Sequence, residues 1–292
     1  MGLMNLLPPT GGRNWGAAVL AALFVSGGIA SAEVKIKKSE TYQDIIEKSQ
    51  NLILQKDRQQ AVNILVNAIR REGVKSPAAV ELKKTLNEAT TLFLSDKAQQ
   101  IYEVGVTLKR TDLNQAQQKM NEGLKLEPDN LLFWIELARV QIAKGDCSAA
   151  DETTGKARLQ NPYFEELNLA QAQTSLCLNK PVEYQKMVDG QDIKKSPLAK
   201  FWNLLEAERL WKEKSFSKAQ ELSLAVKKSD SGYPEVEYWL WKIDQSLKKK
   251  NPGAAEKYVM ACKNISAHLF RQYMIDPMLC HRVAELESSG NE

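Results

Sequence analysis

Side chains able to support acid–base or nucleophilic chemistry are few in this sequence of 292 residues. Its two histidines, His268 and His281, stand thirteen residues apart, and neither lies in a Cys-His-Asp or His-Glu-x-x-His grouping. A carboxylate pair such as Glu165-Glu166 falls in a helix-forming stretch, where a solvated face accounts for it. The sequence has no glycine-rich phosphate loop and no G-x-S-x-G motif. We therefore predict that the chain is not an enzyme and uses no cofactor or metal.

The cysteines are the other group with chemical potential. They are Cys147, Cys177, Cys262 and Cys280. None forms a Cys-x-x-Cys pair, so redox catalysis and zinc binding have little support. Four cysteines in an exported protein indicate two disulfides, for which three pairings exist. The alternative is four free cysteines that behave as small buried apolar groups.

The start of the chain bears on export. Arg13 is the only charge in the first 32 residues, and an apolar run covers residues 15–25. Eleven apolar residues are too few to span a bilayer comfortably. Ala30 and Ala32 match the A-x-A pattern of a signal peptidase site, with cleavage before Glu33.

We therefore predict a signal peptide over residues 1–32 and a mature periplasmic chain over residues 33–292. The alternative is an anchor in the inner membrane formed by an uncleaved segment 15–32. Export favours disulfides over free thiols, because the periplasm is oxidising.

The charge balance excludes one class of partner. The net charge is +4 at pH 7, and removal of the signal peptide takes away only Arg13 and leaves +3. This excess is spread over the whole chain, whereas nucleic-acid binding requires a concentrated basic face. The run Lys248-Lys249-Lys250 precedes Asn251-Pro252 and is typical of a solvated helix end. We expect partners to be proteins or peptide segments, with no nucleic acid and with membrane association only through partners.

The elements that position these residues are predicted to be helices throughout. Ala, Leu, Lys, Glu and Gln dominate nearly every segment, and no run of alternating apolar residues indicates a strand. Residues 76–108 predict either one long helix or two helices with a break near Ser95-Asp96, where Asp96 would cap the second.

One segment of 34 residues shows how the helices are organised. Apolar residues recur at helical spacing, a Gly145-Asp146 turn follows, and small residues and a proline close the unit. These landmarks are Leu131, Trp134, Leu137, Ala138, Ala150, Ala157 and Pro162. Another proline, Pro128, lies 34 residues before Pro162 and closes a preceding segment of the same type.

This order of landmarks resembles the tetratricopeptide repeat (TPR). The resemblance implies an all-α fold, an α-solenoid of stacked antiparallel helix pairs (a TPR-like superhelix) with a C-terminal capping helix. The best-matching repeats cover residues 98–164; degenerate repeats cover 42–75, 165–197 and 198–267, and the cap covers 268–292. The alternative is an ordinary helical bundle in which Trp134 and the alanines are simply core.

The repeat frame also selects among the disulfide pairings. Cys147 stands at the start of one second helix and Cys177 near the end of the following first helix, and antiparallel helices bring these ends together. Cys262 falls on the second helix of the final repeat. Cys280 falls on a tail helix for which Asp276-Pro277 would be the cap and first residue. We therefore expect Cys147–Cys177 and Cys262–Cys280.

In the TPR family, defined positions of the first helices line a groove that holds a partner. Carried over to this sequence, they predict a mixed apolar, aromatic and charged partner-binding groove suited to an amphipathic helix or an extended peptide. Core packing is the alternative for Trp211 and Trp241. The predicted groove residues are Tyr102, Lys109, Ile135, Arg139, Leu204, Glu208, Trp211, Leu240, Trp241 and Asp244.

These features together predict an exported periplasmic TPR-like scaffold or adaptor that binds proteins in envelope assembly, secretion or motility machinery. Two alternatives stay open. In one, the chain is a regulatory or accessory subunit of a cell-wall enzyme. In the other, it is a carrier whose groove binds a small apolar ligand.

Overall fold

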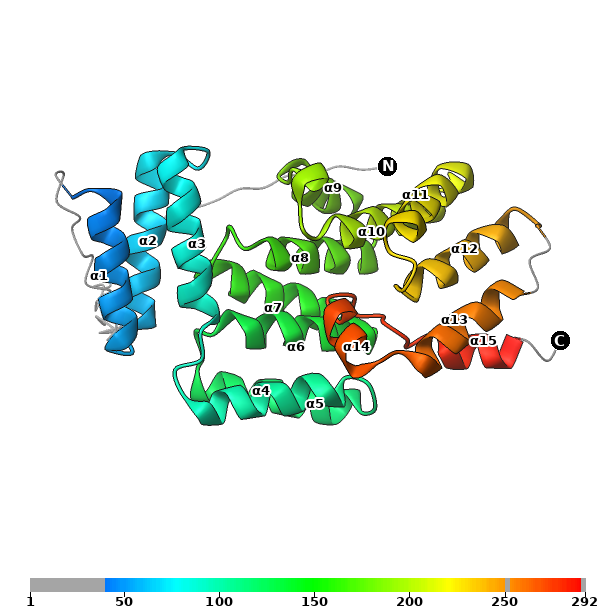
Figure 1. Ribbon diagram of the computed structural model, residues 1–292, viewed down its shortest axis with the longest axis horizontal. Helices are drawn as coiled ribbons and strands as arrows, with labels where there is room; N and C mark the ends of the chain where they lie inside the picture. Colours follow the sequence, from blue (N-terminus) through cyan, green and yellow to red (C-terminus); the bar gives the residue numbers. More distant parts are fainter. Residues whose placement is uncertain (1–39, 250–252, 290–292) are drawn as a thin grey trace, which may run out of the picture. The chain divides into compact units, whose positions relative to one another are not determined.

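The computed structural model describes residues 40–249 and 253–289, and within these ranges all regular structure is helical (Figure 1). The predicted signal peptide, residues 1–32, lies outside the described residues. No helix in the described part of the chain is both long and apolar enough to cross a membrane. The helices are α1 (Tyr42–Leu54), α2 (Arg58–Glu72), α3 (Pro77–Thr91), α4 (Asp96–Leu108), α5 (Leu113–Leu126), α6 (Leu131–Ala143), α7 (Cys147–Gln160), α8 (Glu165–Cys177), α9 (Pro181–Asp189), η1 (Ile193–Lys195), α10 (Ala199–Lys212), α11 (Phe216–Ser229), α12 (Glu235–Ser246), α13 (Gly253–Asn264), α14 (Ala267–Tyr273) and α15 (Val283–Ser289).

Helices adjacent in sequence pack as pairs from α4 onward: α4 with α5, α6 with α7, α8 with α9, α10 with α11, and α12 with α13. Each pair also contacts the next, through α5–α6, α7–α8 and α11–α12 among others. Helix α15 packs on α13 and covers the last pair. The prediction of an all-α stack of helix pairs with a C-terminal capping helix is confirmed.

Short turns and small residues explain why these pairs form. Asp146 accepts a hydrogen bond from the Ala149 amide at the start of α7, and Gly145 takes the left-handed conformation (φ 79°) that ends α6. Gly123 on α5 lies against the Phe133 ring on α6, where a Cβ atom would stand 2.0 Å from a ring carbon. The two helices approach this closely only because position 123 has no side chain.

The first three helices depart from the pair pattern. α1, α2 and α3 all contact one another and form a three-helix unit. The stretch 76–108 is broken into α3 and α4, and the cap of α4 is Ser95, whose hydroxyl accepts from the Ala98 amide at 3.3 Å. The expected cap, Asp96, is instead the first residue of the helix.

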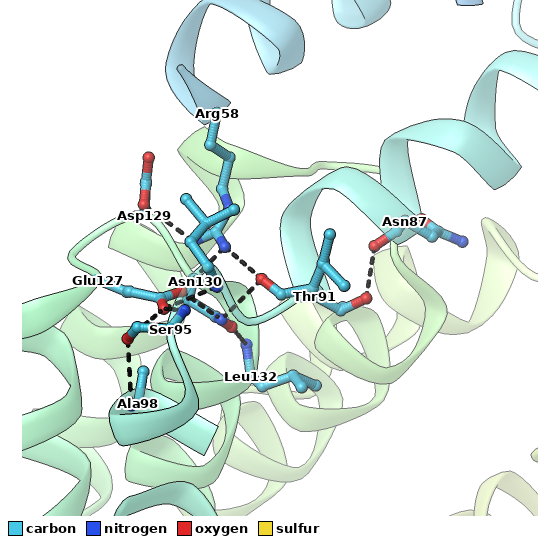
Figure 2. Close-up of polar contacts among 11 residues, drawn as sticks. Arg58, Asn87, Thr91, Ser95, Ala98, Glu127, Asp129, Asn130 and Leu132 are labelled. Atoms are coloured by element: carbon cyan, nitrogen blue, oxygen red, sulfur yellow. Dashed lines mark hydrogen bonds and ion pairs between the residues drawn. The ribbon is translucent and has the colours of Figure 1, made fainter. Parts of the chain in front are cut away.

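A buried arginine joins this unit to the rest of the stack (Figure 2). Arg58 begins α2 with no exposed surface, and its guanidinium donates to the Asp129 and Glu127 carboxylates, each at 3.0 Å, and to the Leu92 carbonyl. Glu127 also accepts from the backbone amide of Leu94 at 2.8 Å. One planar cation therefore ties α2, the α3–α4 connection and the α5–α6 corner together.

Asparagines at two repeat corners hold α3 in place. Asn130 donates to the Leu92 carbonyl at 3.3 Å, and Asn161 donates to the Asn87 side chain at 2.9 Å. Both asparagines are fully buried, so these bonds are shielded from water.

Replacing Arg58 by methionine should destabilise the fold severely. The substitution keeps an apolar stem but leaves the buried Glu127 carboxylate without its cation, which costs about 3–5 kcal/mol. Urea unfolding followed by circular dichroism measures the change. Arg71→Met is the matched control, because its ion pair with Glu72 is about a third exposed and contributes at most about 1 kcal/mol. Equal losses in the two variants would contradict the role given to Arg58.

The C-terminal region corrects one prediction. Asp276-Pro277 does not open the tail helix, which begins at Val283. The backbone of Asp276 is biased away from the helical region by Pro277. The Asp276 carboxylate accepts from the Met278 amide at 2.8 Å, and Cys280 has a left-handed φ of 62°. Residues 274–282 therefore form consecutive turns. Cys280 therefore lies in the turn region before the tail helix.

Both predicted cysteine pairs are bonded in the structure. Cys147 and Cys177 have Cα atoms 5.9 Å apart, and Cys262 and Cys280 have Cα atoms 5.5 Å apart. The first bridge joins the start of α7 to the end of α8, and the second joins α13 to the turns before α15. These covalent links fit a protein of an oxidising compartment.

Removal of the first bridge should lower the free energy of unfolding. The Cys147→Ser, Cys177→Ser double variant opens a loop of 30 residues, for which loop closure contributes about 3–4 kcal/mol. Urea unfolding measures the loss, and a reducing agent should destabilise the wild type at least as much. A count of four reactive thiols in the native protein would show that the bridges are absent.

Candidate functional site

The first helices of the pairs, α4, α6, α8, α10 and α12, form one continuous surface, which we call the first-helix face. α6 contacts α8, α8 contacts α10, and α10 contacts α12. At the other end Tyr102 on α4 meets Phe133 on α6 with ring centroids 5.8 Å apart. This is the surface on which the groove is predicted.

Part of the chain's own C-terminal region, residues 270–282, lies on this face, and we call it the C-terminal segment. Lys109 at the end of α4 donates to the Met274 carbonyl at 3.0 Å, and Gln173 on α8 donates to the Ile275 carbonyl at 3.4 Å. The Met274 side chain packs against the apolar cluster of α4, α5 and α6 that contains Met120 and Phe133. Helix α14 directly follows the last pair in the chain, yet Arg271 on α14 pairs with Glu103 on α4 at 2.9 Å, and Figure 1 draws α14 away from α12 and α11.

Further along the segment, contacts reach the corner between α11 and α12. The Tyr233 hydroxyl donates to the Asp276 carboxylate at 2.5 Å, and the Tyr273 hydroxyl donates to Asp230 at 2.7 Å. The rings of Tyr233 and Tyr273 stack with centroids 4.9 Å apart. Lys200 completes the corner with an ion pair to Asp230 at 2.7 Å.

The segment ends on a buried ion pair at the start of α12. Arg282 donates to Glu235, which has no exposed surface and also accepts from the Tyr258 hydroxyl at 2.9 Å and the Cys280 amide at 2.8 Å. The guanidinium carbon of Arg282 lies 4.4 Å from the Tyr238 ring centroid. Glu235 and the two sulfurs of the second disulfide lie close together, but bonded sulfurs offer no thiolate and Arg282 already neutralises the carboxylate.

A row of buried charges underlies the α4–α8 part of the face. Glu136 on α6 accepts from Lys109 and from Arg139, each at 2.5 Å, and Arg139 also pairs with Glu166 on α8 at 3.0 Å. Glu136 and Arg139 are 1% exposed. Burial alone would raise the pKa of Glu136, but the nearby Lys109 and Arg139 outweigh it and hold this pKa below its usual value of 4.5.

A cavity of about 310 Å³ lies between the segment and helices α8, α10 and α12. Its apolar wall includes Phe201, Leu204 and Trp239, and its polar wall includes Glu208, Lys212 and Arg282. Gln173 also lines it, and its buried side-chain oxygen accepts no hydrogen bond from the described residues. The cavity thus offers apolar surface, charges of both signs, and the Gln173 oxygen as an acceptor that a ligand could use.

The predicted groove residues fall into two groups. Lys109, Ile135, Arg139, Leu204, Leu240 and Asp244 are buried, Lys109 and Arg139 in the charge row and Asp244 beside Gln220. Tyr102, Glu208, Trp211 and Trp241 are half-buried. Trp211 donates to the Ser246 hydroxyl at 2.8 Å and packs on Trp239, so it bridges α10 and α12. A role of the predicted groove residues in partner binding stays a prediction.

Sequence reasoning missed the residues that organise this face. Glu136 gave a signal, since it is the one acid in the apolar stretch 131–142 and stands three residues before Arg139. Met274, Asp276 and Arg282 gave none, because their contacts lie at sequence separations of 165, 43 and 47 residues.

No protein-family model matches this chain, and no curated protein matches it. Among solved structures it is similar to the crystal structure of a tetratricopeptide repeat protein from Parabacteroides merdae ATCC 43184. The TM-score is 0.40 and the sequence identity 13%, and the match covers 81% of this chain and 98% of the other. The stack of helix pairs is established by the helix contacts within this chain and does not rest on this similarity.

Replacing Glu136 by glutamine should cost about 3–5 kcal/mol, because two buried cations lose their shared carboxylate. It should also flatten the acid side of the pH profile. Since the folded pKa of Glu136 is lowered, its contribution is present above pH 4.5 and is lost as the pH falls. Urea unfolding between pH 3 and pH 7 measures both effects.

Glu122→Gln serves as the control, since its pair with Lys119 is largely solvated and the substitution should change little. A wild-type acid slope that persists unchanged in Glu136→Gln would contradict the assignment.

Proposed function

We propose that this chain is an exported helical-repeat scaffold that holds segments of partner proteins on its first-helix face. The observation that carries the proposal is the way this face holds a non-helical peptide segment. Lys109 and Gln173, from two different helix pairs, each donate a hydrogen bond to a main-chain carbonyl. Carbonyl capture of this kind does not depend on the side chains of the bound segment, so it suits a polypeptide ligand.

Location and pathway belong to the same proposal. The A-x-A site before Glu33 and the two cysteine bridges support a periplasmic protein. Helical-repeat stacks present extended surfaces for binding other molecules, which supports a role in envelope assembly, secretion or motility machinery.

Site-specific photo-crosslinking in intact cells tests the proposal. A photoreactive residue at position 212, which lines the cavity on α10, should capture partner proteins. The same residue at position 159, an 82% exposed leucine on the second helix α7, should not. Equal adducts from both positions, or none from position 212, would contradict binding on the first-helix face. N-terminal sequencing of the cellular protein should begin at Glu33.

The cavity favours a second candidate, a carrier for a small ligand. Its volume of about 310 Å³, its apolar wall of Phe201, Leu204 and Trp239 and its charged opposite wall suit a compact molecule with an apolar body and polar groups, one of them a donor for Gln173. Native mass spectrometry of protein purified from its own cells should then show a bound mass that denaturation releases. A mass equal to that of the polypeptide alone would exclude this candidate.

A further inference from the structure

We infer that residues 270–282 are a built-in occupant of the first-helix face, and that a partner reaches this face by displacing them. The inference rests on the proposed function, since it concerns regulation of the same surface. It differs from capping, because a cap covers the last repeat only. This segment contacts α4, α8 and α12, which belong to the first, third and last helix pairs.

The segment is held from several parts of the chain. Its polar partners on the face include the side chains of Lys109, Gln173, Tyr233 and Glu235. The preceding helix α13 adds the Tyr258 hydroxyl, which accepts from the Arg282 amide, and the disulfide. Between Met274 and Arg282 it forms turns, so its main chain is not engaged in a helix ladder. A segment bound in this way has the character of a ligand.

Burial differs along the segment. Phe270, Tyr273, Pro277 and Leu279 are buried, whereas Met274, Ile275, Asp276 and Met278 are only half-buried. The ion pair of Arg271 with Glu103 is exposed on both sides and contributes little. Stretches with few buried apolar contacts open at a lower free energy than the core around them, so opening should begin at the half-buried residues between Tyr273 and Leu279.

The second disulfide keeps the occupant near its site. Cys262 on α13 holds Cys280, so a displaced segment stays covalently attached. A short tether of this kind gives an effective concentration on the order of millimolar. A partner must therefore either bind more tightly than an untethered copy of the segment or be present at high local concentration.

The contacts define the class of partner. It is a polypeptide segment with an apolar side chain for the Met120–Phe133 cluster, a carboxylate for the Tyr233 hydroxyl and a terminal basic residue for the buried Glu235. These three side chains should be spaced along the partner as Met274, Asp276 and Arg282 are in the C-terminal segment. A strongly acidic peptide does not fit, because it brings no cation for the buried Glu235 once Arg282 has left.

The test uses the full chain and a fluorescent synthetic peptide with the sequence of residues 270–282, serine replacing Cys280. The opening variant carries Met274→Glu and Asp276→Ala, which remove the apolar anchor and the acceptor for Tyr233. The control for the carboxylate introduced by Met274→Glu is Gln272→Glu, which adds one carboxylate at an exposed position of the segment. Hydrogen exchange of amides 274–282 and fluorescence anisotropy with the peptide are the two readouts.

In the opening variant, amides 274–282 should exchange at least about ten-fold faster, and the peptide should bind about ten-fold more tightly than to the wild type or the control. Unchanged protection, or faster exchange without tighter peptide binding, would overturn the inference. If the double variant loses its helical circular dichroism, Asp276→Ala alone is measured and should give smaller shifts in the same direction.

The two proposals fail separately. Peptide binding by the opened face without any partner adduct from position 212 would reject the scaffold function and leave the occupant in place. Partner adducts of equal yield from the wild type and the opening variant would reject the occupant and leave the scaffold function.

Discussion

A helix pair cannot bury its apolar surface alone, and this constraint governs the whole molecule. Each pair from α4 to α13 covers its neighbour, and the alanines and glycines at the contacts let the helices approach closely. The flanking elements attach in different ways. The three-helix unit α1–α3 meets the stack through α3, which packs against α6, whereas α15 covers the last pair through α13.

Polar side chains are buried where the stack changes direction or partner. Arg58 lies at the joint between α1–α3 and the repeats, the Lys109–Glu136–Arg139 row lies under the first-helix face, and Glu235 with Arg282 lies under the last pair. Well-paired buried ions of this kind add little net stability, but loss of one partner is costly. They therefore specify which elements meet at each joint more than they strengthen it.

Local patterns were sufficient to predict the repeating part of the fold. The order from Trp134 to Pro162 predicted α6 and α7, and the frame derived from it predicted both cysteine pairs. The break near Ser95 was one of two alternatives that the sequence left open, because no glycine or proline lies between Pro77 and Gly105 to mark it. The packing of α3 against α6 was not predicted. The course of residues 274–282 could not be predicted, since no local pattern records a contact between Lys109 and Met274.

The bridge between Cys147 and Cys177 has a mechanical consequence. It crosses from the second helix of one pair to the first helix of the next, beside α9, which has only 9 residues and no side-chain cap. In stacks of this type, a small rotation between neighbouring pairs sets the curvature of the whole. The disulfide restricts that rotation at the α7–α8 junction, so any change of curvature should occur at the junctions on either side.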